Sequence, residues 1–311
     1  MTTAVTPIPA CWVCGGTQLQ RIHDARLDFT EYKTQDPELA AYSGRQIAIV
    51  RCAACGFAQP AELPALPRYF DRMYDQRWSA DWVEGEYHAP YKDRIFDDVL
   101  TALERRLPGS RRRLLDVGAH AGRFVARARA RGWNADGLEL NPRTAAYASA
   151  ASGGVVHQGN LYTWSRAGAG YDAVTMTDVL EHIPDPRSAL RRAHDLLESG
   201  GWIAIKVPNA PAQQIKENAR ARLRPGYRPT LADNLVHVNH FGTASLRLAL
   251  EREGFTDVET RVAAPEMPPG HGLSERVDRA VRGLAFRVAK VIPGGTRTPL
   301  AFNLQAYGRR A

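Results

Sequence analysis

From Pro108 onward, the pattern of hydrophobic and polar positions alternates between two kinds of segment. Short apolar runs rich in Val, Leu and Ile are typical of buried strands, and longer segments with apolar residues every three or four positions are typical of helices. Strands are expected at residues 113–117, 135–140, 155–156, 173–176, 201–207, 255–261 and 301–307. Helices are expected at residues 94–106, 121–131, 142–151, 186–197 and 244–253. This alternation predicts an α/β fold with a parallel sheet covered on both faces.

The pattern also divides the chain into three parts. We expect an amino-terminal module at residues 1–67, a helical connector at residues 68–107 and a main domain at residues 108–311. The connector is dense in aromatic and charged residues and could lie across a ligand cleft. The main domain carries two insertions, at residues 208–240 and 262–300, and each follows the carboxyl end of a predicted strand. Both insertions are therefore expected to border an active site.

The only four cysteines of the chain form two Cys-x-x-Cys pairs, Cys11 with Cys14 and Cys52 with Cys55. Two such turns supply the four thiolates of a tetrahedral zinc site, which leaves no open position for chemistry. Two buried thiol turns without metal are the alternative. The sequence therefore predicts a small zinc-binding module with a structural zinc ion.

The composition of the chain also bears on its class and on its expected cellular location. Of the 311 residues, 44% are hydrophobic and 24% are charged, which excludes a disordered or fibrous chain. No apolar run approaches the roughly 20 residues that span a bilayer, and the first residues do not resemble a signal peptide. We therefore expect a cytoplasmic protein.

Positive charge is concentrated near the carboxyl terminus. The net charge is +8, and residues 274–311 contain eight basic and two acidic residues, a contribution of 8 − 2 = +6. This local excess suggests an anionic partner rather than general nucleic-acid binding, although a solvated helix face is the alternative. In this segment Val277, Val281, Leu284 and Val288 recur at helical spacing. They would either pack into a core under a lid or dock a phosphorylated, lipid-linked or membrane-surface substrate, with peripheral membrane contact through residues 274–292.

A glycine-containing turn follows the first strand of the main domain, in the segment LLDVGAHAGRF. Gly118 and Gly122 permit a tight turn, and Asp116 lies at the carboxyl end of the strand, where open α/β sheets bind ligands. His120 stands where a Gly-x-Gly-x-Gly loop would have its middle glycine. Glu139 ends the second strand, where an acid can accept hydrogen bonds from both hydroxyls of a ribose. This order suits a nucleoside cofactor without phosphates.

Five motifs in the same order resemble the class I S-adenosylmethionine-dependent methyltransferases. They are LLDVGAHAGRF, GLELNP, GNLYTW, YDAVTMTDVLEHIPDPRSALRRAHDLLESGGWIAIKVPN and HVNHFGTASLRLALEREGF. The resemblance covers roughly residues 90–261 and the last strand, and it implies a doubly wound, Rossmann-like, seven-stranded sheet. The amino-terminal cysteine module, which ends in CGFAQP, resembles a bacterial branch of the family in sugar, polysaccharide and natural-product biosynthesis.

The resemblance also implies a binding site for S-adenosylmethionine. Its predicted members are Asp116, Gly118, His120, Gly122, Glu139, Leu140, Asn160, Leu161, Thr177 and Asp178. Glu139 would hold the ribose, Leu140 would pack near adenine, and Asn160 replaces the usual Asp that bonds the adenine amino group. Asp116 and the glycines would line the methionine part, which Thr177 and Asp178 would close.

Methyl transfer is an in-line displacement that needs alignment, and a base only where the nucleophile must lose a proton. His182, in LEHIPDP after the fourth strand, is the first candidate for that base, and Asp178, His237 and His240 are the others. His182 could instead hydrogen-bond its loop, and His237 and His240 could be residues at a helix entry.

We therefore predict an enzyme that transfers a methyl group to oxygen or carbon of a small or glycosylated metabolite, such as a nucleotide-linked sugar or a natural-product intermediate. Four arginines in the first insertion, Arg220, Arg222, Arg224 and Arg228, suggest an anionic acceptor. One alternative is an RNA or other nucleic-acid methyltransferase, but the chain lacks an Asn-Pro-Pro-Tyr motif and an aromatic-basic array in the cysteine module. The other is a non-catalytic scaffold that binds the cofactor. The sequence leaves the acceptor and the oligomeric state open.

Overall fold

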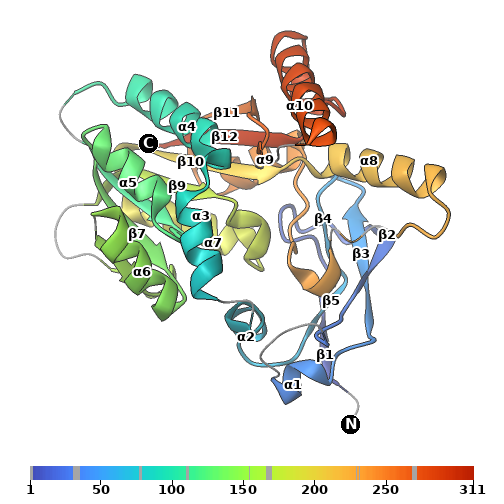
Figure 1. Cartoon of the computed structure of the whole chain (residues 1–311). Helices are drawn as coiled ribbons and strands as arrows, with labels where there is room; N and C mark the ends of the chain where they lie inside the picture. Colours follow the sequence, from blue (N-terminus) through green and yellow to red (C-terminus); the bar gives the residue numbers. More distant parts are fainter. Residues whose placement is uncertain are drawn as a thin grey trace.

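A seven-stranded sheet forms the centre of the protein, and a smaller β module packs beside it (Figure 1). The computed structural model describes residues 3–30, 36–76, 79–109, 112–153, 155–165, 170–228, 230, 232–267 and 272–311. The strands of the large sheet are β6 (Arg113–Val117), β7 (Asn134–Glu139), β8 (Val155–Gln158), β9 (Tyr171–Thr177), β10 (Leu197–Pro208), β11 (Phe255–Ala263) and β12 (Asn303–Arg310). Their order is β11-β12-β10-β9-β6-β7-β8. This sheet confirms the predicted seven-stranded α/β fold.

The direction of one strand differs from the prediction. Five neighbouring strands, from β8 to β10, run parallel. Strand β12 is antiparallel to both of its neighbours, β10 and β11, so the sheet is mixed. A buried strand has the same hydrophobic pattern whether it runs parallel or antiparallel to its neighbours. The sequence pattern therefore could not show that β12 is antiparallel.

Helices cover both faces of the sheet. They are α4 (Asp93–Arg106), α5 (Arg123–Ala130), α6 (Pro142–Ser152), α7 (Pro186–Leu196) and α9 (Thr243–Arg252). Two further helices lie outside these layers: α8 (Ala210–Leu223) adds no residue to either core, and α10 (Leu273–Val291) adds only Phe286. Leu100 of α4 and Phe124 of α5 share one apolar core with Leu114 of β6. Leu190 of α7 and Leu246 of α9 lie in the core of the opposite face. The doubly wound arrangement therefore follows from two separate apolar layers.

The cysteine module is built from short strands. These are β1 (Val5–Pro7), β2 (Leu19–Arg26), β3 (Gln46–Cys52), β4 (Ala58–Pro60) and β5 (Glu62–Pro64), with a short helix α1 (Pro37–Ala40). Strands β2, β3 and β4 form one antiparallel sheet, and β1 pairs with β5. The ring of Phe57 packs 4.9 Å from that of Phe241, and Ala58 forms a β-bridge with His240. The module therefore shares a continuous core with the main domain.

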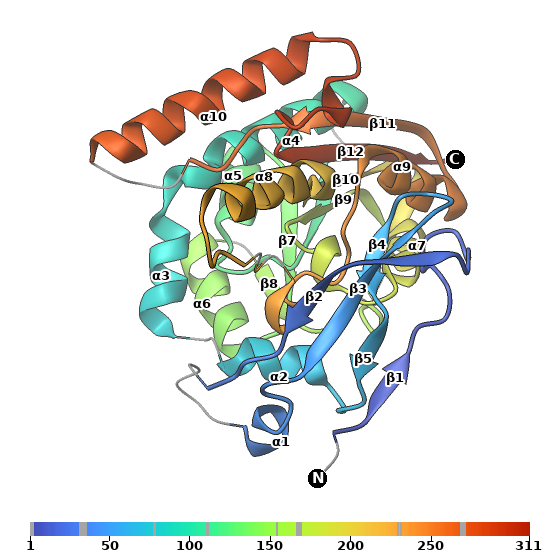
Figure 2. The same ribbon diagram turned by 90° about the vertical axis from the view of Figure 1, so that its right-hand side faces the viewer.

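Two helices, α2 (Tyr69–Gln76) and α3 (Ala80–His88), and the 3-10 turn η1 (Pro90–Lys92) connect the module to α4. Figure 2 shows α2 beneath the small sheet and α3 beside α6. The described part of the connector is therefore mostly helical.

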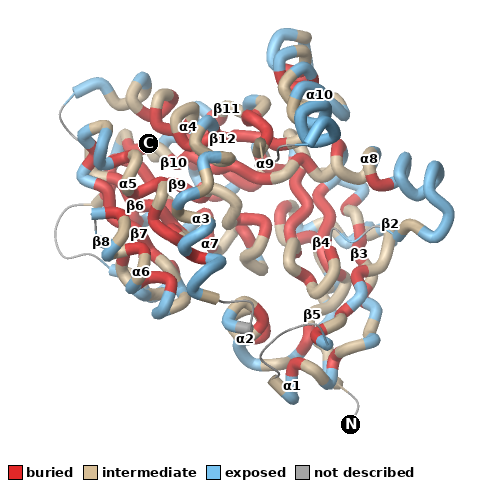
Figure 3. The backbone as a smooth tube through the Cα atoms, viewed as in Figure 1, coloured by how far each residue is buried: buried red, intermediate tan, exposed pale blue. Residues whose placement is uncertain are grey.

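Helix α10 is present where the sequence predicts an amphipathic helix. Its predicted apolar face does not pack into a core, however, and a different face of the helix is buried. Its buried residues are Ala285, Phe286 and Ala289, whereas Val277 and Leu284 are exposed. Figure 3 shows that most of α10 is exposed or only partly buried. No helix among the described residues has the length and apolar character needed to cross a membrane.

Candidate functional site

A cavity of about 650 Å³ lies at the carboxyl ends of β6, β7 and β9. Turns after these strands form its floor, and Phe70, Tyr74 and Trp82 of the connector form part of its wall. Its volume is in the range of pockets that enclose a small molecule or cofactor. The connector thus contributes to the wall of the cavity.

The turn after β6 depends on two glycines with different tasks. At Gly118 φ is +69°, and a Cβ there would lie 2.5 Å from a methyl group of Val179. At Gly122 φ is +83°, and a Cβ would lie 2.9 Å from the Ala148 carbonyl oxygen. Gly118 lines the cavity, whereas Gly122 is absent from its wall and allows α5 to pack closely on α6. The structure therefore does not place Gly122 where the methionine part was expected.

His120 adopts the left-handed conformation, with φ of 47°, that glycine would adopt more easily. Its backbone N–H donates to Glu139 Oε2 at 2.9 Å, and its ring packs edge-on against Trp82 at 4.7 Å between centroids. Burial lowers the pKa of His120 to about 4, so its ring is neutral at pH 7. The side chain therefore serves as part of the cavity wall.

Glu139 is held at the end of β7 by two backbone amides. The His120 amide reaches one carboxylate oxygen, and the Asn141 amide reaches the other at 3.0 Å. Burial raises the pKa of Glu139, and the bonds from the amides oppose that rise. Each oxygen keeps a lone pair for a further donor, which suits the two hydroxyls of a ribose.

Asp116 lies deeper, at the end of β6. Its Oδ1 accepts a hydrogen bond from Thr175 Oγ1 at 2.7 Å, and only 4% of the residue is exposed. Burial raises the pKa of Asp116 to about 7. A positively charged ligand group beside this carboxyl would favour its ionised form.

The predicted adenine end is also on the cavity wall. Leu140, Asn160 and Leu161 line it together with Tyr162. Asn160 Oδ1 accepts the Tyr162 backbone N–H at 2.9 Å, which fixes the amide orientation. An amide oxygen has a second lone pair, so Asn160 can accept one more hydrogen bond.

A cluster of four charges closes the opposite end. Lys206 of β10, only 1% exposed, contacts Asp178 and lies 2.8 Å from Glu266 Oε1. Lys92 Nζ lies 3.1 Å from Asp178 Oδ2. Burial by itself would raise the pKa of Asp178, but the two ammonium groups hold it well below its usual range. Asp178 and Thr177 both line the cavity. A carboxylate paired with two lysines is a weak base.

His182 projects into the same end of the cavity from the 3-10 turn η2 (Leu180–His182). Its Nδ1 lies 2.5 Å from the Val236 carbonyl oxygen and 2.8 Å from the Tyr74 hydroxyl. A carbonyl oxygen only accepts, so Nδ1 carries the proton and Nε2 is the basic nitrogen. The His237 ring lies behind it at 4.8 Å between centroids, and burial lowers the pKa of His237 to about 3.

The loop around His182 is held by the segment that follows α8. The Val238 and Asn239 amides donate to the Glu181 carbonyl oxygen at 2.9 and 3.0 Å. The buried Asn239 side chain donates to the carbonyl oxygens of Leu180 and Ile183. The Glu181 carboxylate is 2% exposed, and its Oε2 has no hydrogen-bond partner among the described residues. Burial raises the pKa of Glu181 to about 8, and the nearby charge of Asp178 adds to that rise.

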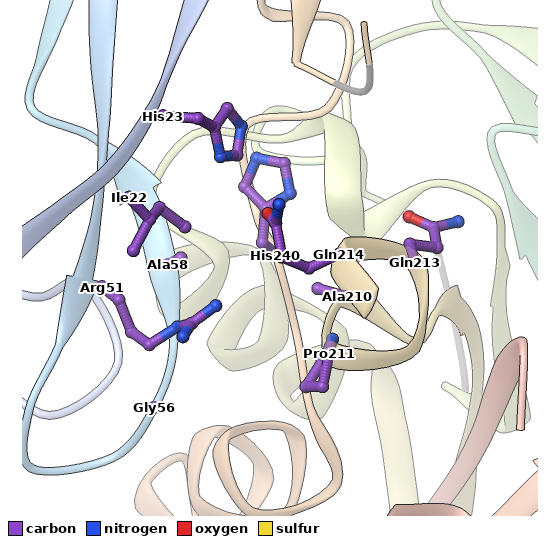
Figure 4. A pocket seen from close by; sticks show the side chains of 10 residues that line it. All are labelled: Ile22, His23, Arg51, Gly56, Ala58, Ala210, Pro211, Gln213, Gln214 and His240. Atoms are coloured by element: carbon purple, nitrogen blue, oxygen red, sulfur yellow. The ribbon is translucent and has the colours of Figure 1, made fainter. Parts of the chain in front are cut away.

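His240 lies apart from the other predicted catalytic residues. Figure 4 shows its ring facing His23 of the cysteine module, with Arg51 nearby, in a pocket at the start of α8. This pocket, of about 20 Å³, has room for about one water molecule. The structure therefore brings Asp178, His182 and His237 together and leaves His240 out.

The four cysteine sulfurs lie in one cluster, with all pairs within 4.8 Å. The Cys11 and Cys55 sulfurs are 3.6 Å apart, and those of Cys14 and Cys52 are 3.4 Å apart. Zn–S bonds of about 2.3 Å in a tetrahedron require sulfurs about 3.8 Å apart. The geometry therefore fits a four-thiolate zinc ion after small adjustments.

Several site residues were missed by the sequence reasoning. They are Tyr74, Lys92, Glu181, Lys206 and Glu266. The Lys in IAIKVP was a detectable signal, because a charge inside an otherwise apolar strand is rarely buried without a partner. Tyr74, Lys92 and Glu266 carried no such signal, since only the fold brings them to the cavity.

The fold is a doubly wound α/β domain whose cavity lies at the carboxyl edge of the sheet, where open α/β sheets bind ligands. The chain belongs to the family of methyltransferase domains, whose family model matches residues 87–260. This membership confirms the class I methyltransferase fold.

The curated relatives are small-molecule methyltransferases by name. The chain is 28% identical over 126 residues to a ubiquinone biosynthesis O-methyltransferase of Nitrosomonas europaea, which covers 39% of this chain and 51% of that protein. It is 28% identical over 150 residues to a trans-aconitate 2-methyltransferase of Rhodococcus jostii, covering 46% and 57%. The chain thus spans about half the length of the curated relatives it matches.

Solved structures show the same kind of similarity. A possible histamine N-methyltransferase of Thermotoga maritima has a TM-score of 0.47 at 18% identity, covering 78% of this chain and 98% of that one. A Haemonchus contortus phosphoethanolamine N-methyltransferase in complex with S-adenosylmethionine has a TM-score of 0.49 at 16% identity, covering 81% and 62%.

The buried carboxyl of Glu181 predicts a pH dependence of stability. The folded protein keeps this proton up to about pH 8, whereas an unfolded carboxyl loses it near its ordinary value of 4.5. Raising the pH through this window therefore favours the unfolded chain. Urea unfolding at pH 5 and pH 8 should show a smaller loss of stability for Glu181→Gln than for the natural protein. Equal losses in both proteins would contradict the assignment.

Proposed function

We propose that this protein transfers a methyl group from S-adenosylmethionine to an oxygen or carbon of a small-molecule acceptor. The observation that carries the proposal is one cavity that joins the amide-bound carboxylate of Glu139 to the imidazole of His182. The names of the curated relatives, which include ubiquinone O-methyltransferases, favour oxygen as the methylated atom.

The residues present fit S-adenosylmethionine. Glu139 would bind the ribose hydroxyls, Leu140 and Leu161 would flank the adenine, and Asn160 would accept from its amino group. The buried carboxyl of Asp116 and the turn at Gly118 would receive the charged methionine part. When bound, the cofactor supplies a methyl group activated by a sulfonium.

The acceptor end of the cavity supports a base role for His182. Because Val236 and Tyr74 hold its Nδ1, the Nε2 lone pair can take the proton of an acceptor hydroxyl. Asp178 would instead hold Lys92 and Lys206 in place. His237 would act through His182, as a positioning residue.

The structure offers less support for an anionic acceptor. Arg220 pairs with Glu217, and Arg228 pairs with Asp233 at 2.7 Å. Neither arginine lines the cavity. A sugar-nucleotide or natural-product acceptor therefore stays a proposal that rests on the resemblance of the cysteine module to that branch.

We also propose that the cysteine module binds a zinc ion. Cys11, Cys14, Cys52 and Cys55 would bind it, and the Gly16 amide donates to the Cys14 sulfur at 3.4 Å, as amides in such turns stabilise thiolates. Its role would be structural, because it would brace the turns that carry Phe57 against Phe241.

Calorimetry with S-adenosylmethionine and S-adenosylhomocysteine tests the cofactor site. Glu139→Ala should weaken binding at least tenfold, about 1.4 kcal/mol, because the ribose hydroxyls lose their acceptor. Glu251→Ala, on the exposed outer surface of α9, is the matched control and should bind normally. A folded natural protein that binds neither compound would refute the proposal.

A screen of small phenols, enols and sugars with labelled methyl donor tests turnover, and RNA serves as a separate arm. With the best acceptor, His182→Ala should lower kcat about 10²- to 10⁴-fold, the range of a lost general base, without changing cofactor affinity. The exposed His88→Ala is the control. Cofactor binding without any turnover would favour the scaffold alternative, and an unchanged kcat in His182→Ala would exclude the base role.

Elemental analysis of the purified protein should find about one zinc per chain, the content of a four-thiolate site. Cys52→Ser should lose the metal and unfold at lower temperature, whereas Ala54→Ser in the same turn should keep both properties. A fully folded natural protein without metal would contradict the zinc site.

A further inference from the structure

Helix α10 presents an apolar stripe to solvent over most of its length. Leu273, Val277, Val281, Leu284 and Val291 are 78%, 54%, 56%, 62% and 78% exposed. At 100° per residue, these positions and the half-buried Val288 fall within an arc of roughly 80° on one side of the helix. In Figures 1 and 2 the helix extends along the outside of the molecule, above the edge of the sheet that carries β11.

The buried side of α10 lies opposite the stripe and is confined to its carboxyl-terminal half. Ala285, Phe286 and Ala289 pack into the body, and the Arg94 guanidinium lies 4.8 Å from the Phe286 ring. Residues 273–284 include no buried residue. The helix is therefore anchored by a different face, and the fold does not use the stripe for its core.

Basic residues border the stripe. The helix carries Arg276, Arg279, Arg282, Arg287 and Lys290 against only Glu275 and Asp278. Asp278 is already paired with Arg282 at 2.6 Å. Arg276 and Arg287 lie on the flank next to the apolar arc, and neither forms an ion pair with another described residue. One flank of the stripe is therefore positive.

We propose that α10 is a docking surface for an anionic lipid bilayer, in which the helix lies along the interface with its Leu and Val side chains among the acyl chains. Lys and Arg beside an apolar helix face are attracted to the negative surface of anionic lipid, which adds to the burial of the apolar side chains. This proposal concerns binding and does not depend on methyl transfer.

Two features argue against other occupants. In a two-fold dimer with antiparallel α10 helices, the flank with Arg276 and Arg287 would face itself, which costs free energy by like-charge repulsion. The stripe also contains only aliphatic side chains, whereas the central anchors of protein interfaces are enriched in Trp, Tyr and Arg. Charge complementarity therefore favours a lipid surface.

Vesicle flotation tests the surface. The natural protein should float with vesicles of phosphatidylcholine and phosphatidylglycerol in equal parts, and it should stay in solution with pure phosphatidylcholine or at high salt. Val277→Glu and Leu284→Glu should each reduce flotation at least tenfold. Val155→Glu, at a half-exposed position on the opposite edge of the sheet, is the matched control and should float normally.

A double variant, Arg276→Glu with Arg287→Glu, tests the contribution of the basic residues. It should abolish flotation while leaving the apolar stripe intact. Thermal melting of each variant confirms that it is folded. No flotation of the natural protein, or equal flotation of the natural protein and Val277→Glu, would overturn the proposal. Light scattering that shows a dimer lost in Val277→Glu, without lipid binding, would assign the stripe to self-association instead.

Discussion

The geometry of the proposed acceptor end depends on the burial of Lys206. A lysine with 1% exposure inside a sheet is tolerated only when carboxylates replace its water, and here Asp178 and Glu266 do so. Asp178 follows β9, Glu266 follows β11, and Lys92 brings the end of the connector to the same point. One buried charge thus ties together the end of β9, the segment after β11 and the connector. The turn that carries His182 begins directly beyond Asp178, so its position depends on this network.

The second constraint is the shared core of the two parts of the chain. Cys11 and Cys52 lie in the same apolar cluster as Met176 of the large sheet, and β4 bridges to His240. The segment of His240 also carries Asn239, which clamps the loop around His182. A change in the cysteine module could therefore reach the cavity through a few packed residues, although the cysteines themselves do not line it. This connection gives the proposed structural zinc a physical link to the site.

The residues at the proposed cofactor end of the cavity follow more directly from the sequence than those at the proposed acceptor end. Glu139, Asp116 and Gly118 lie on consecutive strand ends, so their spacing in the chain nearly determines their positions in space. Gly122 shows the limit of that reasoning, because its lack of a side chain serves the packing of α5 on α6 and not the ligand. Tyr74 and Lys92 reach the cavity from a connector whose path no local pattern describes. His240 is only three residues from His237, yet it faces the cysteine module.

Local patterns in the chain were not sufficient for α8 or for most strands of the cysteine module. They were sufficient for the order of the seven strands of the large sheet and most of the helices between them, for the paired cysteines and for the turn that follows β6. These features depend on periodicity, on backbone conformation and on ligand chemistry between near neighbours, all of which are local. Other features depend on contacts between residues far apart in the chain. They are the antiparallel direction of β12, the ion pairs of Asp178 with two lysines and the tautomer of His182. The exposed stripe of α10 belongs with them, because an amphipathic sequence defines an apolar face but only packing decides whether that face turns inward.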